Sequence, residues 1–473
     1  MRPYVRSIRV VALGIVLALT PSLEAGAQAN PRAGWETQAR ALLKELVEIN
    51  TTESKGSTLA ATEAMARHMR AAGFPEADVV VTPITDRKGN LVVRFRGRNT
   101  GKKPILLLSH IDVVEADPRD WTLPPFEFIE KDSTFFGRGV ADDKDEGAIH
   151  LTVLLRMKAE GVVPDRDIIV ALTSDEETGE NNGVVWLLEN RRDLIDAEYA
   201  FNEGGGGRLE DGRRVSNDVQ ASEKKYADFR LETTNPGGHS SQPRRDNAIY
   251  SLVHALERVE GYRFPVRLNE VTREYFRRQS SITGGAMGDA MRRIVANERD
   301  SAAAAILSRD PGNSSRLRTS CVATMLEGGH APNALPQRAR ANVNCRILPD
   351  VPAAEVQKKL TEIVGDTGVK ITSLTGTRDS PPSPLTPDLL RSIETTTKEM
   401  WPGVPVVPTM STGATDGLWL RSAGIPVYGL SGLFYGESNA HGMNERISAR
   451  GFYDGLEFMY RLVRRITTTG PGT

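Results

Sequence analysis

The stretch Ile105-Leu106-Leu107-Leu108-Ser109-His110-Ile111-Asp112 carries an apolar run into a histidine and, two residues later, an aspartate. The apolar runs 168–172 and 199–201 end in the same way, at Asp175-Glu176-Glu177 and at Glu203. Continuous apolar runs of this length are typical of buried parallel strands. In open α/β sheets the ligand crevice lies beyond the carboxyl ends of the strands. The sequence therefore predicts an α/β fold with its functional site at that edge of the sheet.

Two kinds of pattern divide the chain of 473 residues, which is long enough for two or three domains. From 30 to 223, helical and strand patterns alternate, as in a mixed or parallel sheet covered by helices. Between 224 and 378, strand candidates such as 226–233 and 338–347 alternate polar with apolar residues, which is typical of an antiparallel sheet with one wet face. We predict a catalytic α/β domain, 30–223 and 379–473, interrupted by a smaller α+β domain, 224–378.

The N-terminus predicts an export signal, residues 1–29. Three arginines within the first nine residues precede the apolar stretch 10–19, and Ala27-Gln28-Ala29 has the small-x-small form of a cleavage site. An uncleaved anchor is the alternative, but a run of about ten apolar residues is short for spanning a bilayer. We expect cleavage after Ala29 and a protein that is periplasmic or secreted.

Composition and charge limit the kinds of partner that we expect for this protein. The formal net charge is −1 at pH 7, with no basic stripe or aromatic–basic interleaving, so nucleic acid is not an expected partner. Beyond the signal no stretch is long and apolar enough to cross a membrane, so no membrane partner is expected after cleavage.

The two cysteines leave two interpretations open. Cys321 and Cys345 each lie 12 residues from Asn333, so a hairpin centred there would place them opposite one another. Export into an oxidising compartment allows a disulfide. The alternative is two buried thiols, because both cysteines share alternating faces with small apolar neighbours such as Ala323 and Ala341. We favour the thiols.

Residues far apart in the sequence form a set of metal-ligand types. Histidine nitrogen and carboxylate oxygen suit zinc, and two metals about 3.5–4 Å apart need a bridging carboxylate and a further ligand set for each. His110 and His441 supply imidazoles, and Asp142 is a short carboxylate suited to bridging. Glu177 and Glu203 complete the two sets. We predict a site for two Zn²⁺, with Mn²⁺ or Co²⁺ as substitutes.

Two further carboxylates adjoin this set. Asp112 lies on the same side of its strand as His110, so it can hold the histidine in one tautomer. Glu176 is next to a ligand yet points elsewhere, so it could take a proton from a metal-bound water. Each pattern also has an alternative interpretation without a catalytic role, because a His-x-Asp pair is often structural and Asp-Glu-Glu is often a solvated surface run.

Taken in order, these motifs resemble the metallopeptidase family that includes aminoacylase, carboxypeptidase G, carnosinase and succinyl-diaminopimelate desuccinylase. The matching stretches are 109–114, 137–144, 173–179, 202–205, 237–241, 333–336, 413–416 and 440–442. The resemblance spans nearly the whole mature chain. It implies a zinc-exopeptidase-type mixed sheet sandwiched by helices, with the inserted domain as a lid that often mediates dimerisation.

The resemblance also implies roles at the metal centre, those of a dinuclear zinc hydrolase. By position, Asp142 matches the bridging ligand, His110 and Glu203 match one metal's set, and Glu177 and His441 match the other's. Glu176 matches the general acid/base. Family members hold a cis peptide after the bridging aspartate, here Asp142-Asp143.

Substrate contacts are implied mainly in the inserted domain. His239 matches a histidine that reaches the substrate carbonyl, in many dimeric members from the neighbouring subunit, where a donor would stabilise the oxyanion. Asn333 and Arg346 match residues that hold the substrate carboxylate, a task that suits arginine. Gly413 is a further expected substrate contact. Without the family, His239 could cap a helix or face solvent, and Arg346 could be an ordinary polar-face strand residue.

Three local features are expected to matter less. The four glycines 204–207 exceed the family pattern and predict a loosened loop after Glu203. Asp145-Glu146 stands where many relatives have glycine, and a helix N-terminus tolerates that charge. Turn formers at 310–313 predict an irregular segment.

The predicted reaction is hydrolysis of an amide or peptide bond. Glu203 and the segment 121–126 resemble the aminoacylase and carboxypeptidase branches, which favours small N-acyl amino acids or short peptides with a free carboxylate. One alternative is a dipeptidase or amidohydrolase acting on free-amine substrates. Another is a metal- or peptide-binding protein without catalysis, against which Glu176 argues, since a binder needs no base. A phosphatase or nuclease is disfavoured because no phosphate-cradling loop accompanies the carboxylates.

Overall fold

The computed structural model describes residues 1, 31–99, 101–376, 378–434 and 436–468, so the predicted signal segment lies outside the described residues apart from Met1. Within them, a large sheet of nine strands forms the centre of the molecule. Across the sheet the strands are β1 (Val79–Pro83), β2 (Gly89–Phe95), β6 (Ile168–Thr173), β3 (Ile105–His110), β7 (Tyr199–Asn202), β17 (Val427–Gly429), β9 (Arg213–Glu223) and β16 (Val406–Ser411), and β8 (Gly206–Glu210) pairs with β9.

The three strands predicted from the apolar runs lie side by side and are parallel. Residue Ile105 of β3 is in register with Ile168 of β6 on one side and with Tyr199 of β7 on the other. β2 joins β6 in the antiparallel direction, so the sheet is mixed, as predicted. The common direction of β3, β6 and β7 brings their carboxyl ends to one edge.

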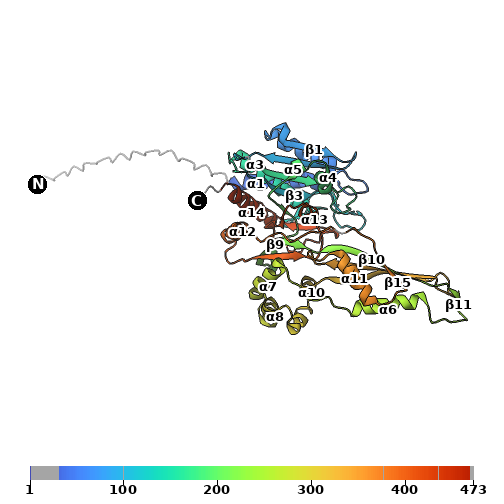
Figure 1. Cartoon of the computed structure of the whole chain (residues 1–473). Helices are drawn as coiled ribbons and strands as arrows, with labels where there is room; N and C mark the ends of the chain where they lie inside the picture. The colour runs from blue at the N-terminus through green and yellow to red at the C-terminus, as the bar shows by residue number, and fades with distance from the viewer. Residues whose placement is uncertain (2–30, 100, 377, 435, 469–473) are drawn as a thin grey trace.

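Helices cover both faces of the large sheet (Figure 1). Ile105 and Leu107 pack towards one face and Leu106 and Leu108 towards the other, as the alternation of a strand requires. One face carries α1 (Pro31–Glu48), α2 (Thr58–Ala71), α3 (Lys144–Ala159), α12 (Pro387–Met400) and α14 (Ala449–Thr468), with η1 (Glu76–Asp78) beside β1. The other face carries α4 (Gly183–Asn190), α5 (Arg192–Ile195) and α13 (Gly417–Ser422). None of the helices in the described ranges is long and apolar enough to cross a membrane.

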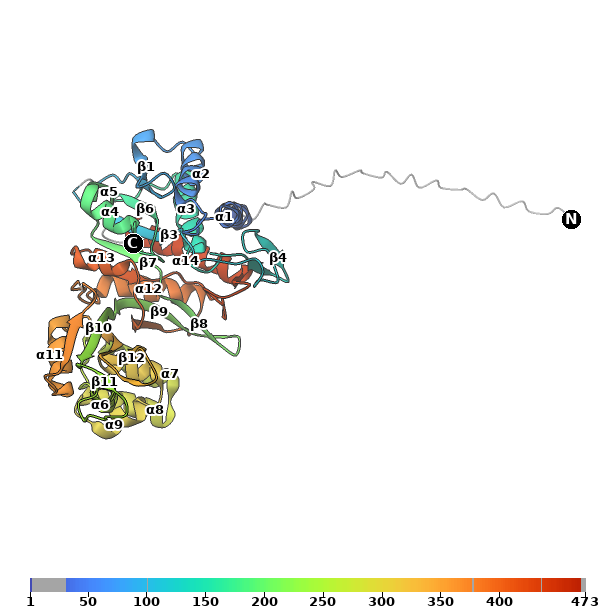
Figure 2. The same cartoon turned by 90° about the vertical axis from the view of Figure 1, so that its right-hand side faces the viewer.

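A second, antiparallel sheet lies in the predicted insert. Its strands, in order, are β12 (Ser320–Gly328), β14 (Arg338–Ile347), β10 (Lys225–Thr234) and β15 (Val369–Ser373). One face is covered by α6 (Ala248–Gly261) and α11 (Ala353–Val364), and the other stays partly exposed. The fold class is therefore as predicted, while the exact residues that bound the domains stay a prediction. In both views β1 lies at one end of the molecule and α6 and α8 at the other (Figures 1 and 2).

A group of four helices in the insert packs on the large sheet through α7, and not on the small sheet. They are α7 (Glu270–Thr283), α8 (Gly285–Ala296), α9 (Ser301–Leu307) and α10 (Pro311–Leu317), and they share a core with Val407 of β16. The prediction of an irregular segment at 310–313 is wrong. Asp310 caps α10 by accepting a hydrogen bond from the backbone N–H of Asn313 at 2.7 Å, and Pro311 occupies the first turn.

Cys321 and Cys345 form a disulfide, so the preference for two buried thiols is wrong. The register of β12 with β14 pairs the two cysteines directly, with a Cα–Cα distance of 4.1 Å, as the hairpin centred on Asn333 predicted. The small apolar neighbours made thiols plausible, but side chains at directly opposed antiparallel positions are already close enough to bond.

Candidate metal centre and active site

The edge formed by β3, β6 and β7 brings together all five predicted metal ligands. His110 ends β3, Glu177 follows β6 and Glu203 follows β7. Asp142 comes from the loop before α3, and His441 from the loop before β18 (Arg446–Ser448). β18 pairs with β5 (Thr134–Phe136), which pairs on its other side with β4 (Ile129–Lys131). Three groups have ligand atoms within 4.8 Å of one another: His110, Asp142 and Glu203; His110, Glu176 and Glu177; and Asp142, Glu177 and His441.

Asp142 lies between two histidine–glutamate sets. Its Oδ1 is 3.0 Å from His110 Nε2, and its Oδ2 is 3.0 Å from His441 Nε2. His110 Nε2 is in turn 3.9 Å from a Glu203 oxygen, and His441 Nε2 is 2.8 Å from a Glu177 oxygen. Each oxygen of one carboxylate therefore faces a different set, as a bridging ligand between two metals requires. The peptide bond after Asp142 is cis, as the resemblance implied.

The electrostatics of the centre require positive charge. Burial raises the pKa of Glu203 well above its ordinary value and that of Glu176 to about 10, with further upward contributions from neighbouring carboxylates. Hydrogen bonds from the two histidines outweigh burial and lower the pKa of Asp142. In the part of the chain that the structure describes, no Lys or Arg forms an ion pair with these carboxylates or with Glu177. A donor set of imidazoles and crowded carboxylates fits two divalent cations.

Asp112 holds the turn that carries the two glutamates. Its carboxylate accepts hydrogen bonds from the backbone N–H groups of Glu176 at 3.1 Å and Glu177 at 3.0 Å. The Nδ1 atom of His110 lies 3.2 Å from the main-chain oxygen of Asp112 and 3.6 Å from its carboxylate. The main-chain oxygen of Asp112 is thus the nearer partner of the histidine, and the predicted role of its carboxylate in orienting His110 stays a prediction. The same carboxylate fixes the backbone of Glu176 and Glu177, which the sequence did not indicate.

A buried ion pair ties the loop of Asp142 to the loop of His441. Arg138 Nη1 lies 2.7 Å from a Glu445 oxygen, and both side chains are almost fully buried. The other Glu445 oxygen accepts hydrogen bonds from the backbone N–H groups of Gly139 at 3.1 Å and Ala141 at 2.9 Å. These contacts fix the two loops relative to each other. Glu445 was missed because nothing near it in the sequence marks its partner.

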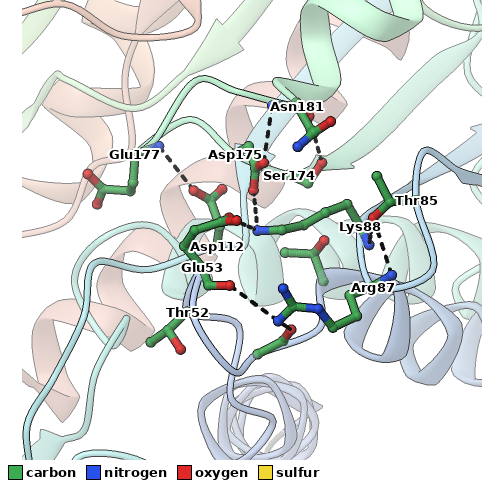
Figure 3. A network of polar contacts seen from close by, with 12 residues as sticks. Thr52, Glu53, Thr85, Arg87, Lys88, Asp112, Ser174, Asp175, Glu177 and Asn181 are labelled. Carbon is green, nitrogen blue, oxygen red and sulfur yellow. Dashed lines mark hydrogen bonds and ion pairs between the residues drawn. The ribbon is translucent and has the colours of Figure 1, made fainter.

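A second buried network lies under the glutamate turn (Figure 3). Lys88 Nζ is 2.5 Å from Asp175 Oδ1 and also contacts the carboxylate of Glu53. Asp175 has a left-handed backbone, with φ of 56°, and its second oxygen accepts a hydrogen bond from the N–H of Asn181 at 3.2 Å. The Lys88 side chain is 4% exposed and that of Asp175 is 0% exposed. Lys88 therefore anchors Asp175 immediately before Glu176.

Three carboxylates lie just before and within the first turn of α3, where the sequence indicated only that a helix N-terminus tolerates the charge of Asp145 and Glu146. Asp143, Asp145 and Glu146 are all buried. Both carboxylate oxygens of Asp145 are without a hydrogen-bond partner in the described structure. Burial raises the pKa of all three groups, and mutual repulsion adds to it for Glu146 and Asp143. The negative field of the centre therefore extends into α3.

The substrate residues predicted in the insert do not join the metal centre within one chain. His239 is exposed on β11 (Gly238–His239), which pairs with β13 (Ala334–Leu335) at the far end of the small sheet (Figure 1). Asn333 lies beside it, because its carbonyl accepts a hydrogen bond from the Ser240 N–H at 3.0 Å. Arg346 lies over the Tyr226 ring, 4.9 Å from its centroid. Their roles stay predictions.

Gly413 lies much nearer, in the loop after β16. Its N–H donates to Ser411 Oγ at 3.0 Å. Ser411 and Thr412 line a cavity of about 650 Å³ that also contains Asp142, Glu146 and Glu203.

The glycines 204–207 form one wall of this cavity. A Cβ on Gly205 would lie 2.0 Å from the carbonyl oxygen of Gly429, and one on Gly207 would lie 2.1 Å from the Phe434 ring. The expected loosening of this segment is wrong, because the glycines are needed for close packing against 429–434, and Gly206 begins β8.

The fold and the two ligand sets around one carboxylate define a metal-dependent hydrolase. The chain belongs to Peptidase family M20/M25/M40, whose sequence model matches residues 106–465. It is therefore a hydrolase that acts on amide bonds, and the predicted family is confirmed.

Similar proteins agree with this assignment. The chain is 28% identical over 389 residues to the probable carboxypeptidase S-like 2 of Dictyostelium discoideum, covering 79% of this chain and 74% of that protein. It is 26% identical over 399 residues to the N-fatty-acyl-amino acid synthase/hydrolase PM20D1 of Homo sapiens, covering 79% of this chain and 76% of that protein. The solved M20 family metallo-carboxypeptidase from Sulfolobus solfataricus shares the fold, with a TM-score of 0.67 at 19% identity over 90% of this chain and 98% of that one.

Replacing Lys88 by Met is expected to lower the free energy of unfolding by about 3–5 kcal/mol, because Asp175 would be left buried without its counter-charge. Urea unfolding followed by circular dichroism measures this. The matched control is Lys103→Met, which removes an exposed ion pair with Asp196 (3.2 Å) and is expected to cost about 1 kcal/mol or less. Equal losses in the two variants would show that Lys88 does not anchor the turn.

Proposed function

We propose that this enzyme hydrolyses small N-acyl amino acids or short peptides that carry a free carboxylate, with two Zn²⁺ as its cofactor. The observation that carries the proposal is the position of Asp142, with one histidine–glutamate set on each of its oxygens and Glu176 beside them. The similarity to a probable carboxypeptidase S-like protein and to an N-fatty-acyl-amino acid synthase/hydrolase supports this substrate class.

Each metal would have its own ligands. His110 and Glu203 with one oxygen of Asp142 would hold the first ion, and His441 and Glu177 with the other oxygen would hold the second. Zinc supplies a water of lowered pKa at neutral pH and polarises a bound carbonyl.

Glu176 is the proposed general base. Its carboxyl group has no hydrogen bond or ion pair with any described residue, so it is free to face a substrate. Burial raises the pKa of Glu176 and neighbouring carboxylates add to it, whereas positive charge at His110, or on cations bound beside it, would favour the ionised form. That carboxylate can accept a proton from water and pass it to the leaving nitrogen. Asp112 keeps Glu176 in place through the backbone.

We further propose an exported homodimer that associates through the small sheet. The Nδ1 atom of His239 accepts a hydrogen bond from the Ser241 N–H, so in the neutral ring Nε2 carries the proton and is free to donate. The edge strand β12 exposes Val322, Met325 and Leu326, each more than half exposed, and exposed apolar edges favour association. In such a dimer, His239 of the partner subunit would donate to the substrate oxyanion.

The substrate class is tested with zinc-loaded protein from residue 30 onward. The rate of hydrolysis of N-acetyl-L-methionine and other N-acyl amino acids is compared with that of free-amine dipeptides that end in the same amino acid. We expect faster hydrolysis of the acylated set, and loss of both activities on chelation with return after zinc is added. Preference for the dipeptides would contradict the proposal and identify a dipeptidase.

Replacing Glu176 by Gln is expected to lower kcat by about 10²–10⁴-fold, because the neutral amide cannot take the proton. Metal content should stay at two ions per chain, measured by atomic emission on dialysed protein. The matched control is Glu189→Gln on α4, an exposed glutamate that should leave kcat unchanged. Near-normal turnover of Glu176→Gln would refute the assigned role.

A mixing experiment tests the contribution of His239 across the dimer. Glu176→Gln and His239→Ala homodimers should each be nearly inactive. After exchange of subunits, each heterodimer has one site with both defects and one intact site, so random mixing should restore about one quarter of wild-type activity. Mixtures that stay inactive would exclude action across the dimer.

A further inference from the structure

The cavity that Asp142 and Glu203 line also has a charged wall. Besides Asp142 and Glu203, it is lined by Arg208 on β8, Arg316 on α10 and Asp218 on β9. Two guanidinium groups and the carboxylate of Asp218 therefore share this wall, while Asp143 and Glu146, close in sequence to Asp142, line the same cavity. Glu437, at the same cavity, is 84% exposed and lies 3.3 Å from Arg446, so it is already paired.

The two arginines differ in how many hydrogen bonds and ion pairs they form with other residues. Arg208 donates to Ser216 Oγ at 3.3 Å and to Gln279 Oε1 at 3.1 Å, and it lies 3.5 Å from a Glu210 oxygen. Arg316 has no carboxylate within ion-pair distance among the described residues, and its buried Nε has no hydrogen-bond partner there. Its guanidinium lies over the Tyr275 ring, 4.7 Å from the centroid, which holds the group in place. Arg316 thus presents a positioned, unpaired cation to the cavity.

Asp218 does not neutralise Arg316 by direct contact. Its Oδ1 accepts a hydrogen bond from Ser216 Oγ at 2.6 Å, and no ion pair with either arginine falls within 4 Å. Burial raises the pKa of Asp218, although Ser216 and the two arginines act in the opposite direction. Arg316 is therefore the cation of this wall that has no ion-pair partner in the described part of the chain, and an anionic group is the ligand that guanidinium binds best.

The position of the wall indicates which half of the substrate it meets. The four residues predicted to hold the carbonyl and the amino-acid carboxylate are His239, Asn333, Arg346 and Gly413, and none of them is among the residues that line this cavity. One cavity is lined by Asp142 and Glu203, by the glycines 204–207 and by Arg316. This shared space leaves room for the acyl half beside the metal ligands.

We propose that Arg316 binds a carboxylate on the acyl group of the substrate, so that the preferred substrates are N-acyl amino acids with an acidic acyl chain. The proposal rests on the proposed function and narrows its substrate class. A charged wall suits such chains better than long apolar ones, because burying an unpaired guanidinium against hydrocarbon is unfavourable.

The test compares N-succinyl-L-methionine with N-succinamoyl-L-methionine, which differ only in the charge at the end of the acyl chain. The zinc-loaded wild type is expected to show a kcat/KM at least about 10-fold higher for the succinyl substrate. Arg316→Gln should bring that ratio to about 3-fold or less, and Arg316→Lys should keep part of it. The matched control, Arg309→Gln, removes an exposed arginine between α9 and α10 and should leave the ratio unchanged.

A second measurement uses succinate as an inhibitor of N-acetyl-L-methionine hydrolysis. Its inhibition constant should rise at least about 10-fold in Arg316→Gln. A wild-type ratio near one, or equal losses on both substrates in Arg316→Gln, would overturn the inference and leave the proposed function standing if N-acetyl-L-methionine is hydrolysed. If the wild type with both metals hydrolyses no N-acyl amino acid, the proposed function fails and the inference with it.

Discussion

Mutual repulsion among the carboxylates around Asp142 is the constraint on which the rest of the structure depends. Glu176, Glu177 and Glu203 converge there with two histidines, and no Lys or Arg pairs with them in the described ranges. Bringing such groups together out of water is unfavourable unless cations or protons compensate. The fold must therefore hold the ligands against their own repulsion, and divalent ions supply the compensating charge.

Charged groups behind the centre provide this support, and they act on backbone more than on ligand side chains. Asp112 accepts from the N–H groups of the glutamate turn, and Lys88 holds that turn from below through Asp175. Glu445 binds the backbone of the loop that carries Asp142, while Arg138 connects it to the loop of His441. Because these partners are buried, each interaction is strong only while both members are present. These contacts between protein groups thus hold the ligand-bearing loops in place.

Sequence alone could predict the features that are local. The ends of three apolar strands carry His110, Glu177 and Glu203, and parallel strands place such ends together whatever the connections between them. Lys88, Glu445 and Arg316 could not be predicted, because each acquires its role from a partner or cavity formed by distant segments. The predictions for the two cysteines and for the glycines 204–207 failed for a related reason. Their environment depends on strand register and on the close approach of 429–434, which local composition does not encode.

The most direct test of a two-ion centre bridged by one carboxylate is the zinc stoichiometry of metal-free protein, measured by calorimetric titration of wild type and Asp142→Asn. A centre bridged by Asp142 predicts two ions per chain for the wild type. It predicts that Asp142→Asn weakens both binding events together, by at least about 10-fold each, because both ligand sets share that residue. Loss of one ion with the other bound at wild-type affinity, or a single ion in the wild type, would contradict the account.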